Sequence, residues 1–431
     1  MQHFKFFQLL VISLLSFTSY AQIPIKIANP YNVPVLFLAS DSVPMVTVHV
    51  GFKAGSAMDG ELFGLSALTS SLLTKGYANL NTQEVANLIA DTGAIIDAST
   101  SRDMLDLAIN SLTEPMAYKN AMQIFTAILS KPSFSNANLE QQKKQQQAVL
   151  RFDKESPNAV AINDFFQSLY LTHPYAHPIN GTAKTIQKIT RKDVVSFYER
   201  YLVRENAVIV IVGKISVNEA KKLANDILSK LKKGKKAPNI PLAKPLTKPF
   251  SKHIDFKATQ TTFYLGQLGI THHNKNYFPL MVGNYILGSG DLNSRLSLVL
   301  REKNGLTYGV SSEFLPMPGI GPFYIHFATK NRAANEALEL TNQVVKDFIT
   351  KGPTEDELNK AKAYLVGSFP LALASNTSIA GKLLKIAFYD LPYDFLATYV
   401  QNLQAVTAEE VKIAMQATLR ASNMLTVEVG P

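Results

Sequence analysis

Histidine side chains are the first candidates for chemistry in this 431-residue chain. Two pairs lie close together in the sequence, His173 with His177 and His272 with His273. Imidazole nitrogens four residues apart can hold one zinc ion where a helix brings them to the same face. A proline follows both His173 and His177, and these prolines disfavour a helix there. Neither pair has a suitable third ligand nearby, so an independent zinc site built from histidines is the least supported hypothesis.

Thiolate and phosphate chemistry find little support. The chain has no cysteine, which excludes thiolate metal ligands, cysteine nucleophiles and disulfides. A glycine-rich turn at Gly288, Ser289 and Gly290 has the composition of a phosphate loop, but no Gly-Lys-Ser or Gly-Lys-Thr follows it. The turn is therefore either a packing turn or part of another kind of site.

Composition and charge place the chain among globular proteins. Hydrophobic residues make up 46% of the chain and charged residues 18%, and the length predicts two or more domains. The formal net charge of +10 could indicate nucleic acid or an anionic membrane surface. Much of this charge lies between residues 221 and 252, so we interpret it as a solvated basic linker and expect no nucleic-acid partner.

The first 21 residues have the pattern of a secretory signal peptide. Lys5 supplies the positive charge, residues 6–17 the short apolar core, and Ser19-Tyr20-Ala21 a small-x-small cleavage site. An uncleaved anchor is the alternative, but the apolar run is shorter than the ~20 residues that a membrane span needs. No later stretch is long and apolar enough for a stable span. We expect an exported protein, periplasmic or extracellular after cleavage near Ala21.

Patterns of apolar residues and turn signals predict two halves of similar element order. The first half has strands at residues 33–38, 45–52, 93–100, 104–111 and 207–213, and helices at 64–76, 82–92, 115–129, 136–152, 191–205 and 217–231. The second half has strands at 262–266, 308–312, 321–329 and 424–429, helices at 277–287 and 294–302, and a long helix capped by Thr354 and Glu357. A basic, proline-rich linker at 233–252 separates them.

This order predicts an α+β fold made of two tandem homologous domains, residues 22–232 and 253–431. Each domain is a mostly antiparallel sheet covered by helices. The repeat is visible as element order rather than as sequence identity.

The helix predicted at residues 64–76 carries a family resemblance. Its frame resembles that of the insulinase/pitrilysin-type zinc peptidases, whose inverted zinc motif H-x-x-E-H lies in a sequence close to G-L-A-H-F-L-E-H-M-L-F-K-G. The matching positions are Gly64, Leu65, Leu72, Leu73, Lys75 and Gly76. The resemblance implies the fold of this family over nearly the whole mature chain.

The zinc-binding positions of that frame are degenerate. The two histidines and the glutamate fall on Ala67, Ser70 and Ser71, and neutral Ala and Ser side chains cannot replace zinc ligands or a general base. The third ligand of the family, a glutamate on a later helix, falls near Gln147 or Val149, and neither residue is an acid. The resemblance therefore implies that this chain has lost its own zinc centre and binds no cofactor.

A second signature of the family is intact. Residues 287–308 are similar to L-G-x-G-x-x-S-R-L followed by L-R-E-K-x-G-L-x-Y. The resemblance implies that Arg301 and Tyr308 form a pair that holds substrate carbonyl groups and stabilises the transition state. Guanidinium and phenol donors suit that role. It also implies that Gly288, Ser289 and Gly290 belong to a substrate-binding loop.

Two hypotheses of function follow from the resemblance. The first is the non-zinc subunit of a heterodimeric metallopeptidase, which encloses a peptide together with a homologous zinc-bearing subunit; the zinc is then expected in the partner, where it activates water. The second is a catalytically inert structural, assembly or peptide-binding protein of the same fold. Retention of Arg301 and Tyr308 favours the first hypothesis.

Overall fold

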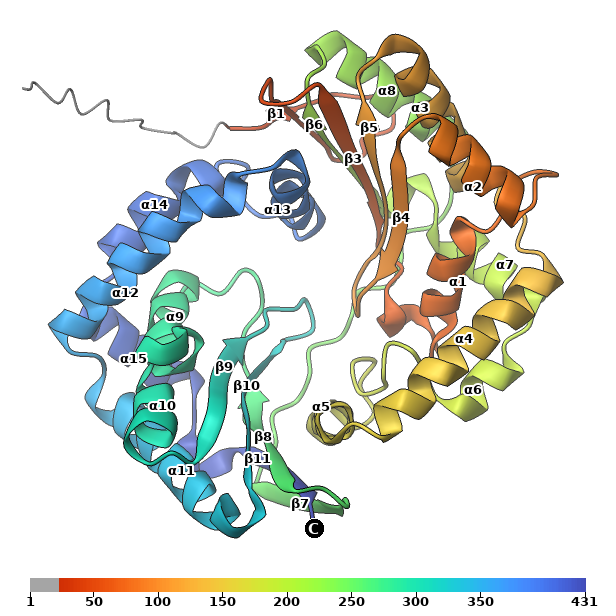
Figure 1. Ribbon diagram of the computed structural model, residues 1–431. Coiled ribbons are helices and arrows are strands. Elements are labelled where there is room, and N and C mark those ends of the chain that lie inside the picture. The colour runs from red at the N-terminus through yellow and green to blue at the C-terminus, as the bar shows by residue number, and fades with distance from the viewer. Residues whose placement is uncertain (1–22) are drawn as a thin grey trace, which may run out of the picture.

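The computed structural model describes residues 23–431 and contains two β-sheets with helices around them (Figure 1). The predicted signal peptide, residues 1–21, lies outside the described residues. No helix among residues 23–431 combines the length and the apolar composition that crossing a bilayer requires.

The first half is built on a six-stranded sheet with the order β1-β2-β6-β3-β5-β4. All neighbouring strands are antiparallel except β2 and β6, which are parallel. The strands are β1 (Ile25–Lys26), β2 (Val35–Ala39), β3 (Met45–Phe52), β4 (Ile95–Thr100), β5 (Leu105–Leu112) and β6 (Ala207–Gly213). Strand β1 was not predicted, and the bounds of the other five agree with the predicted strands to within a few residues.

The second half repeats this sheet without the first strand. Its order is β7-β11-β8-β10-β9, and β7 and β11 form its parallel pair, as β2 and β6 do in the first half. The strands are β7 (Phe250–Asp255), β8 (Gln260–Leu268), β9 (Thr307–Phe314), β10 (Pro322–Lys330) and β11 (Leu425–Gly430). The predicted α+β fold with two similar halves is confirmed.

Helices of the first half occur where amphipathic patterns predict them, with two additions. They are α1 (Leu65–Leu73), α2 (Thr82–Asp91), α3 (Pro115–Ser130), α4 (Asn136–Lys154), α5 (Pro157–Tyr170), α6 (Ala183–Lys188), α7 (Arg191–Tyr201) and α8 (Val217–Lys230). Helices α5 and α6 were not predicted. The residue before α2, Asn81, forms its capping box with Glu84.

Helices of the second half are α9 (Tyr277–Asn284), α10 (Arg295–Ser297), α11 (Ala334–Lys351), α12 (Glu355–Ser368), α13 (Asn376–Phe388), α14 (Phe395–Ala405) and α15 (Ala408–Thr418). The predicted cap of α12 by Thr354 and Glu357 is confirmed. The helices predicted at 277–287 and 294–302 both end as π-helical turns, at Tyr285–Ser289 and Leu298–Lys303.

Each sheet has one face covered by helices of its own half. In the first half α1, α3, α7 and α8 pack on apolar side chains such as Val48, Val50 and Ile211. In the second half α9, α11 and α15 pack on Phe263, Leu265 and related residues. These two clusters are the main hydrophobic cores.

The other face of each sheet is covered by a helix from the opposite half. Helix α5 of the first half packs on β8 and β11 through Phe165 and Leu169, beside Tyr264 and Val427. Helix α13 of the second half packs on β3 and β6, with Leu383 and Leu384 beside Val208. The halves therefore exchange one helix each, an arrangement that can be followed by label in Figure 1.

The segment between the halves is extended. Residues 232–249 contain no helix or strand. Strand β7 begins at Phe250, so the last residues of the predicted linker, 250–252, belong instead to the sheet of the second half. The prolines of this segment lie outside regular elements, as their missing N–H groups require.

Candidate functional site

Helix α1 keeps its frame without zinc ligands. Gly64 precedes it with a φ of 94°, and the Asp59 carboxylate accepts hydrogen bonds from the N–H groups of Gly64 (2.7 Å) and Ser66 (2.8 Å). Burial raises the pKa of Asp59 to about 7, although these hydrogen bonds oppose the shift. The start of α1 is thus fixed by a buried cap and does not depend on a metal ion.

The degenerate positions have no metal-binding alternative around them. Ala67 and Ser71 are half-buried and Ser70 is buried, and the Ser71 hydroxyl donates to the Leu68 carbonyl oxygen at 2.9 Å. Among residues 23–431, no group of three or more His, Asp or Glu side chains is placed to hold a metal ion. On α4, Val149 is exposed and Gln147 is half-buried.

His173, His177 and His272 contact neighbouring groups of this chain. The His177 ring stacks on Phe63 with centroids 4.3 Å apart, and His173 Nε2 lies 2.8 Å from the Pro241 carbonyl oxygen. The segment that holds them is not helical. His272 stacks on Tyr389 with centroids 3.7 Å apart. Burial lowers the pKa values of His173 and His177, and lowers that of His272 to about 4, so a neutral ring is favoured at each position.

The structure brings Arg301 and Tyr308 together. The Arg301 guanidinium carbon lies 5.1 Å from the centroid of the Tyr308 ring, a cation–π distance. Arg301 also has a long ion pair with Glu302, at 3.6 Å. Tyr308 is 88% exposed although it lies in strand β9. The pair therefore forms at the surface, where a bound molecule can reach the phenol.

The glycine turn is tightly packed. A Cβ at Gly288 would lie 2.3 Å from the Ser312 hydroxyl, and a Cβ at Gly290 would lie 2.6 Å from the Tyr285 carbonyl oxygen. Both glycines are buried, and Ser289 between them is exposed. Close packing thus accounts for the glycines, and of the predicted loop Ser289 alone offers a side chain to solvent.

Asp103, in the turn between β4 and β5, joins the two halves. Its carboxylate accepts hydrogen bonds from the hydroxyl groups of Tyr175 (2.5 Å) and Tyr389 (3.3 Å). The Tyr175 hydroxyl in turn accepts from the Gly319 N–H at 3.2 Å. Burial raises the pKa of Asp103 to about 6, and the tyrosine hydrogen bonds limit the rise.

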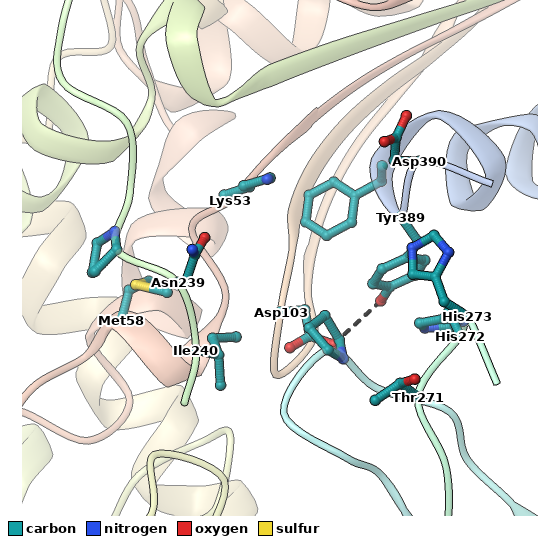
Figure 2. Close-up of a pocket in the computed structure, with 13 residues that line it drawn as sticks. Lys53, Met58, Asp103, Asn239, Ile240, Thr271, His272, His273, Tyr389 and Asp390 are labelled. Atoms are coloured by element: carbon teal, nitrogen blue, oxygen red, sulfur yellow. Dashed lines mark hydrogen bonds between the residues drawn. The ribbon is translucent and has the colours of Figure 1, made fainter. Parts of the chain in front are cut away.

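Two cavities adjoin this contact. The first, of about 350 Å³, is lined by residues of the first half, the linker and the second half (Figure 2). Figure 2 shows the Asp103–Tyr389 hydrogen bond at this cavity, together with Lys53, Asn239 and His272. The second cavity, of about 400 Å³, contains Arg102, Asp153, Tyr324 and Tyr389 in its wall.

Sequence reasoning missed these residues for an identifiable reason. Asp103 and Tyr389 are 286 positions apart, so no spacing connects them. Helix α5, which supplies Phe166 to the second cavity, was also missed. Its signal was present: Ser156 caps the helix, Pro157 occupies its first turn, and buried aromatic residues repeat along it.

A family model described as "Insulinase (Peptidase family M16)" matches residues 35–183. A second model, described as "Peptidase M16 inactive domain", matches residues 188–365. The first match lies within the first half, and the second runs from the end of α6 through the linker into α12 of the second half.

Similar proteins cover most of the chain. A Helicobacter pylori protein named "Non-peptidase homolog YmxG" is 27% identical over 89% of this chain and 88% of its own. A Schizosaccharomyces pombe protein named "Probable mitochondrial-processing peptidase subunit beta" is 25% identical over 78% of this chain and 75% of its own.

A solved structure of a similar protein supports the same family. The peptidase M16 inactive domain from Pseudomonas fluorescens has a TM-score of 0.92 and 33% identity, and the match covers 95% of this chain and 98% of that one. The family resemblance of residues 64–76 and 287–308 is thereby confirmed. The chain belongs to the insulinase family, peptidase family M16.

Proposed function

We propose that this chain is the non-zinc subunit of an exported heterodimeric zinc peptidase. It binds peptides in a chamber shared with a homologous subunit that carries the zinc ion, and it is inactive alone. Arg301 and Tyr308 hold the peptide and stabilise the charge that develops during its hydrolysis. The observation that carries the proposal is that these two side chains meet at an exposed position while Ala67, Ser70 and Ser71 provide no zinc ligand.

The exposure of Tyr308 supports a role in binding. A large aromatic side chain that packed only for stability would be buried, yet this one is 88% exposed and stacked against a guanidinium group. The pairing hypothesis is also supported by a relative that is named as a subunit of a processing peptidase.

Strand β4 supports peptide binding by this fold. It is one of the two edge strands of its sheet, so one row of its backbone N–H and C=O groups faces no neighbouring strand of that sheet. Ile95 and Asp97 are exposed on it. An extended peptide can add to such an edge through main-chain hydrogen bonds.

Co-expression with a zinc-bearing insulinase-family protein of the same organism tests the proposal. We expect this chain alone to contain no zinc and to hydrolyse no peptide, and the purified mixture to hydrolyse peptides faster than the partner alone. Arg301→Ala or Tyr308→Phe should lower the rate of the mixture at least about tenfold, because each removes a donor to the developing oxyanion.

Matched variants separate this role from general damage. Arg332→Ala and Tyr364→Phe also alter exposed residues of the second half, and both should leave the rate unchanged. All variants should still co-purify with the partner. A mixture no more active than the partner alone would instead support the alternative of an inert structural or assembly protein.

A further inference from the structure

Arg102 is held rigidly at the boundary between the halves. Its carbonyl oxygen accepts a hydrogen bond from the Ala57 N–H, and the flanking carbonyl groups of Ser101 and Asp103 accept from Ser56 and Gly55. A Cβ at Gly55 would lie 2.4 Å from the Arg102 carbonyl oxygen, so this contact requires glycine. The turn that carries Arg102 is thus fixed before any ligand arrives.

The guanidinium group of Arg102 is largely buried and forms no ion pair with a carboxylate of residues 23–431. Arg102 is 9% exposed, and its guanidinium carbon lies 3.8 Å from the centroid of the Phe166 ring. Its Nε–H is buried without a hydrogen-bond acceptor. The neighbouring Asp103 carboxylate is engaged by two tyrosines.

A buried arginine without a counter-ion is costly unless something completes its hydrogen bonds. Burial lowers the pKa of Arg102 to about 10, so the group keeps its charge at neutral pH. The second cavity, of about 400 Å³, has Arg102 in its wall, and this volume is within the range of pockets that bind small ligands.

The rest of the wall limits the ligand. Apolar side chains form much of it, namely those of Ile162, Phe166, Pro178, Ile179, Leu315 and Met317. Asp103 and Asp153 also contribute to it and disfavour a strongly anionic group such as phosphate. A singly charged carboxylate next to an apolar side chain fits both features, and guanidinium binds carboxylate through two parallel hydrogen bonds.

We propose that Arg102 binds a peptide carboxylate in the second cavity, with the adjoining side chain against the apolar wall. The carboxylate comes either from the peptide C-terminus or from an Asp or Glu side chain. This inference rests on the proposed function, since it names the part of a peptide that the chain recognises. It is tested on this chain alone, so it can fail or stand independently of the pairing with a zinc-bearing subunit.

Calorimetric titration at pH 7 with three synthetic peptides tests the proposal. The probes are N-acetyl-Ala-Leu-Leu as the free acid, the same peptide as its C-terminal amide, and N-acetyl-Ala-Leu-Glu amide. We expect the free acid to bind at least about tenfold more tightly than its amide, the scale of a charge-assisted hydrogen-bond pair. Comparable binding of the Glu peptide amide would identify a side-chain carboxylate as an equal source, and weaker binding would identify the C-terminus.

Variants assign the preference to Arg102. Arg102→Met keeps an extended apolar chain over Phe166 and should abolish the preference for the acid, and Arg102→Lys should reduce it. Arg204→Met is the matched control, because Arg204 also stacks on an aromatic ring, Tyr31, and has an unpartnered buried Nε, but belongs to neither cavity wall. That variant should keep the preference.

If Arg102→Met misfolds, two measurements still test the proposal. One is the comparison of acid and amide on the unmodified chain, and the other is the Arg102→Lys variant. The proposal is overturned if neither the free acid nor the Glu peptide amide binds more tightly than the Ala-Leu-Leu amide, or if neither carboxylate peptide binds up to about 1 mM. It is also overturned by an unchanged preference for the carboxylate in the folded Arg102→Met variant. Acid-selective binding by a chain that does not activate a zinc-bearing partner would uphold this inference and reject the pairing.

Discussion

Asp103 shows how one side chain connects distant parts of this molecule. Its carboxylate lies in a turn of the first sheet, yet its hydrogen-bond donors Tyr175 and Tyr389 come from the loop after α5 and from the end of α13. Because the group is 5% exposed, its charge is poorly solvated, and the tyrosine hydroxyls compensate only in part. The proton on this carboxyl group is therefore linked to the stability of the contact between the halves.

We expect this linkage in the pH dependence of melting. The pKa of Asp103 is raised from its ordinary value of 3.8 to about 6, so between these values the folded chain binds more protons than the unfolded chain. The free energy of unfolding then falls as pH rises through this window, by about 3 kcal/mol from this group. From pH 4 to pH 7, the melting temperature of the wild type should therefore fall relative to that of Asp103→Asn.

The exposed residue Asp97 provides the control. Asp97→Asn alters an exposed carboxyl group on β4. The difference in melting temperature between this variant and wild type should be the same at pH 4 and pH 7. If wild type and Asp103→Asn changed in parallel from pH 4 to pH 7, the Asp103 carboxyl group would not titrate as its burial implies.

At the scale of elements, the sequence predicted most of the strands, because buried apolar runs such as residues 207–213 have few alternatives. It also predicted that Arg301 and Tyr308 belong together, although through the family resemblance and not through spacing. The exchange of α5 and α13 could not be predicted. An amphipathic pattern shows that one face of a helix is buried, but not which sheet buries it.

Helix α5 should therefore stabilise the sheet of the opposite half. Phe165 is fully buried against Tyr264 and Tyr324 of the second half, with ring centroids 6.1 Å and 5.9 Å away. Phe165→Ala removes this packing and leaves a cavity, which should cost about 3–5 kcal/mol. Hydrogen exchange should show lost protection in β8 and β11, which lie far from position 165 in the sequence.

Phe152→Ala is the matched change on the preceding helix. Phe152 is 72% exposed, so its truncation should have little effect on stability or on exchange in either sheet. Loss of protection confined to the first half in Phe165→Ala would contradict the packing of α5 on the sheet of the second half.

At the scale of the whole molecule, the linker is not what keeps the halves together. Each half contains a helix whose apolar face is buried by the sheet of the other half, so separation would expose Phe165 and Leu169 of α5 and Leu383 and Leu384 of α13. Exposure of that apolar surface to water is unfavourable. Polar contacts such as Asp103 with Tyr389 add to the apolar packing.

Cutting the linker tests this arrangement. A protease site inserted between Thr247 and Lys248, which are both exposed and outside regular elements, should be cleaved without loss of either core. The two fragments should co-elute in gel filtration at the volume of the uncut protein and should separate only in denaturant. Fragments that separate in native buffer would mean that the exchanged helices contribute less than the covalent link, and that the halves can part far enough to admit large ligands.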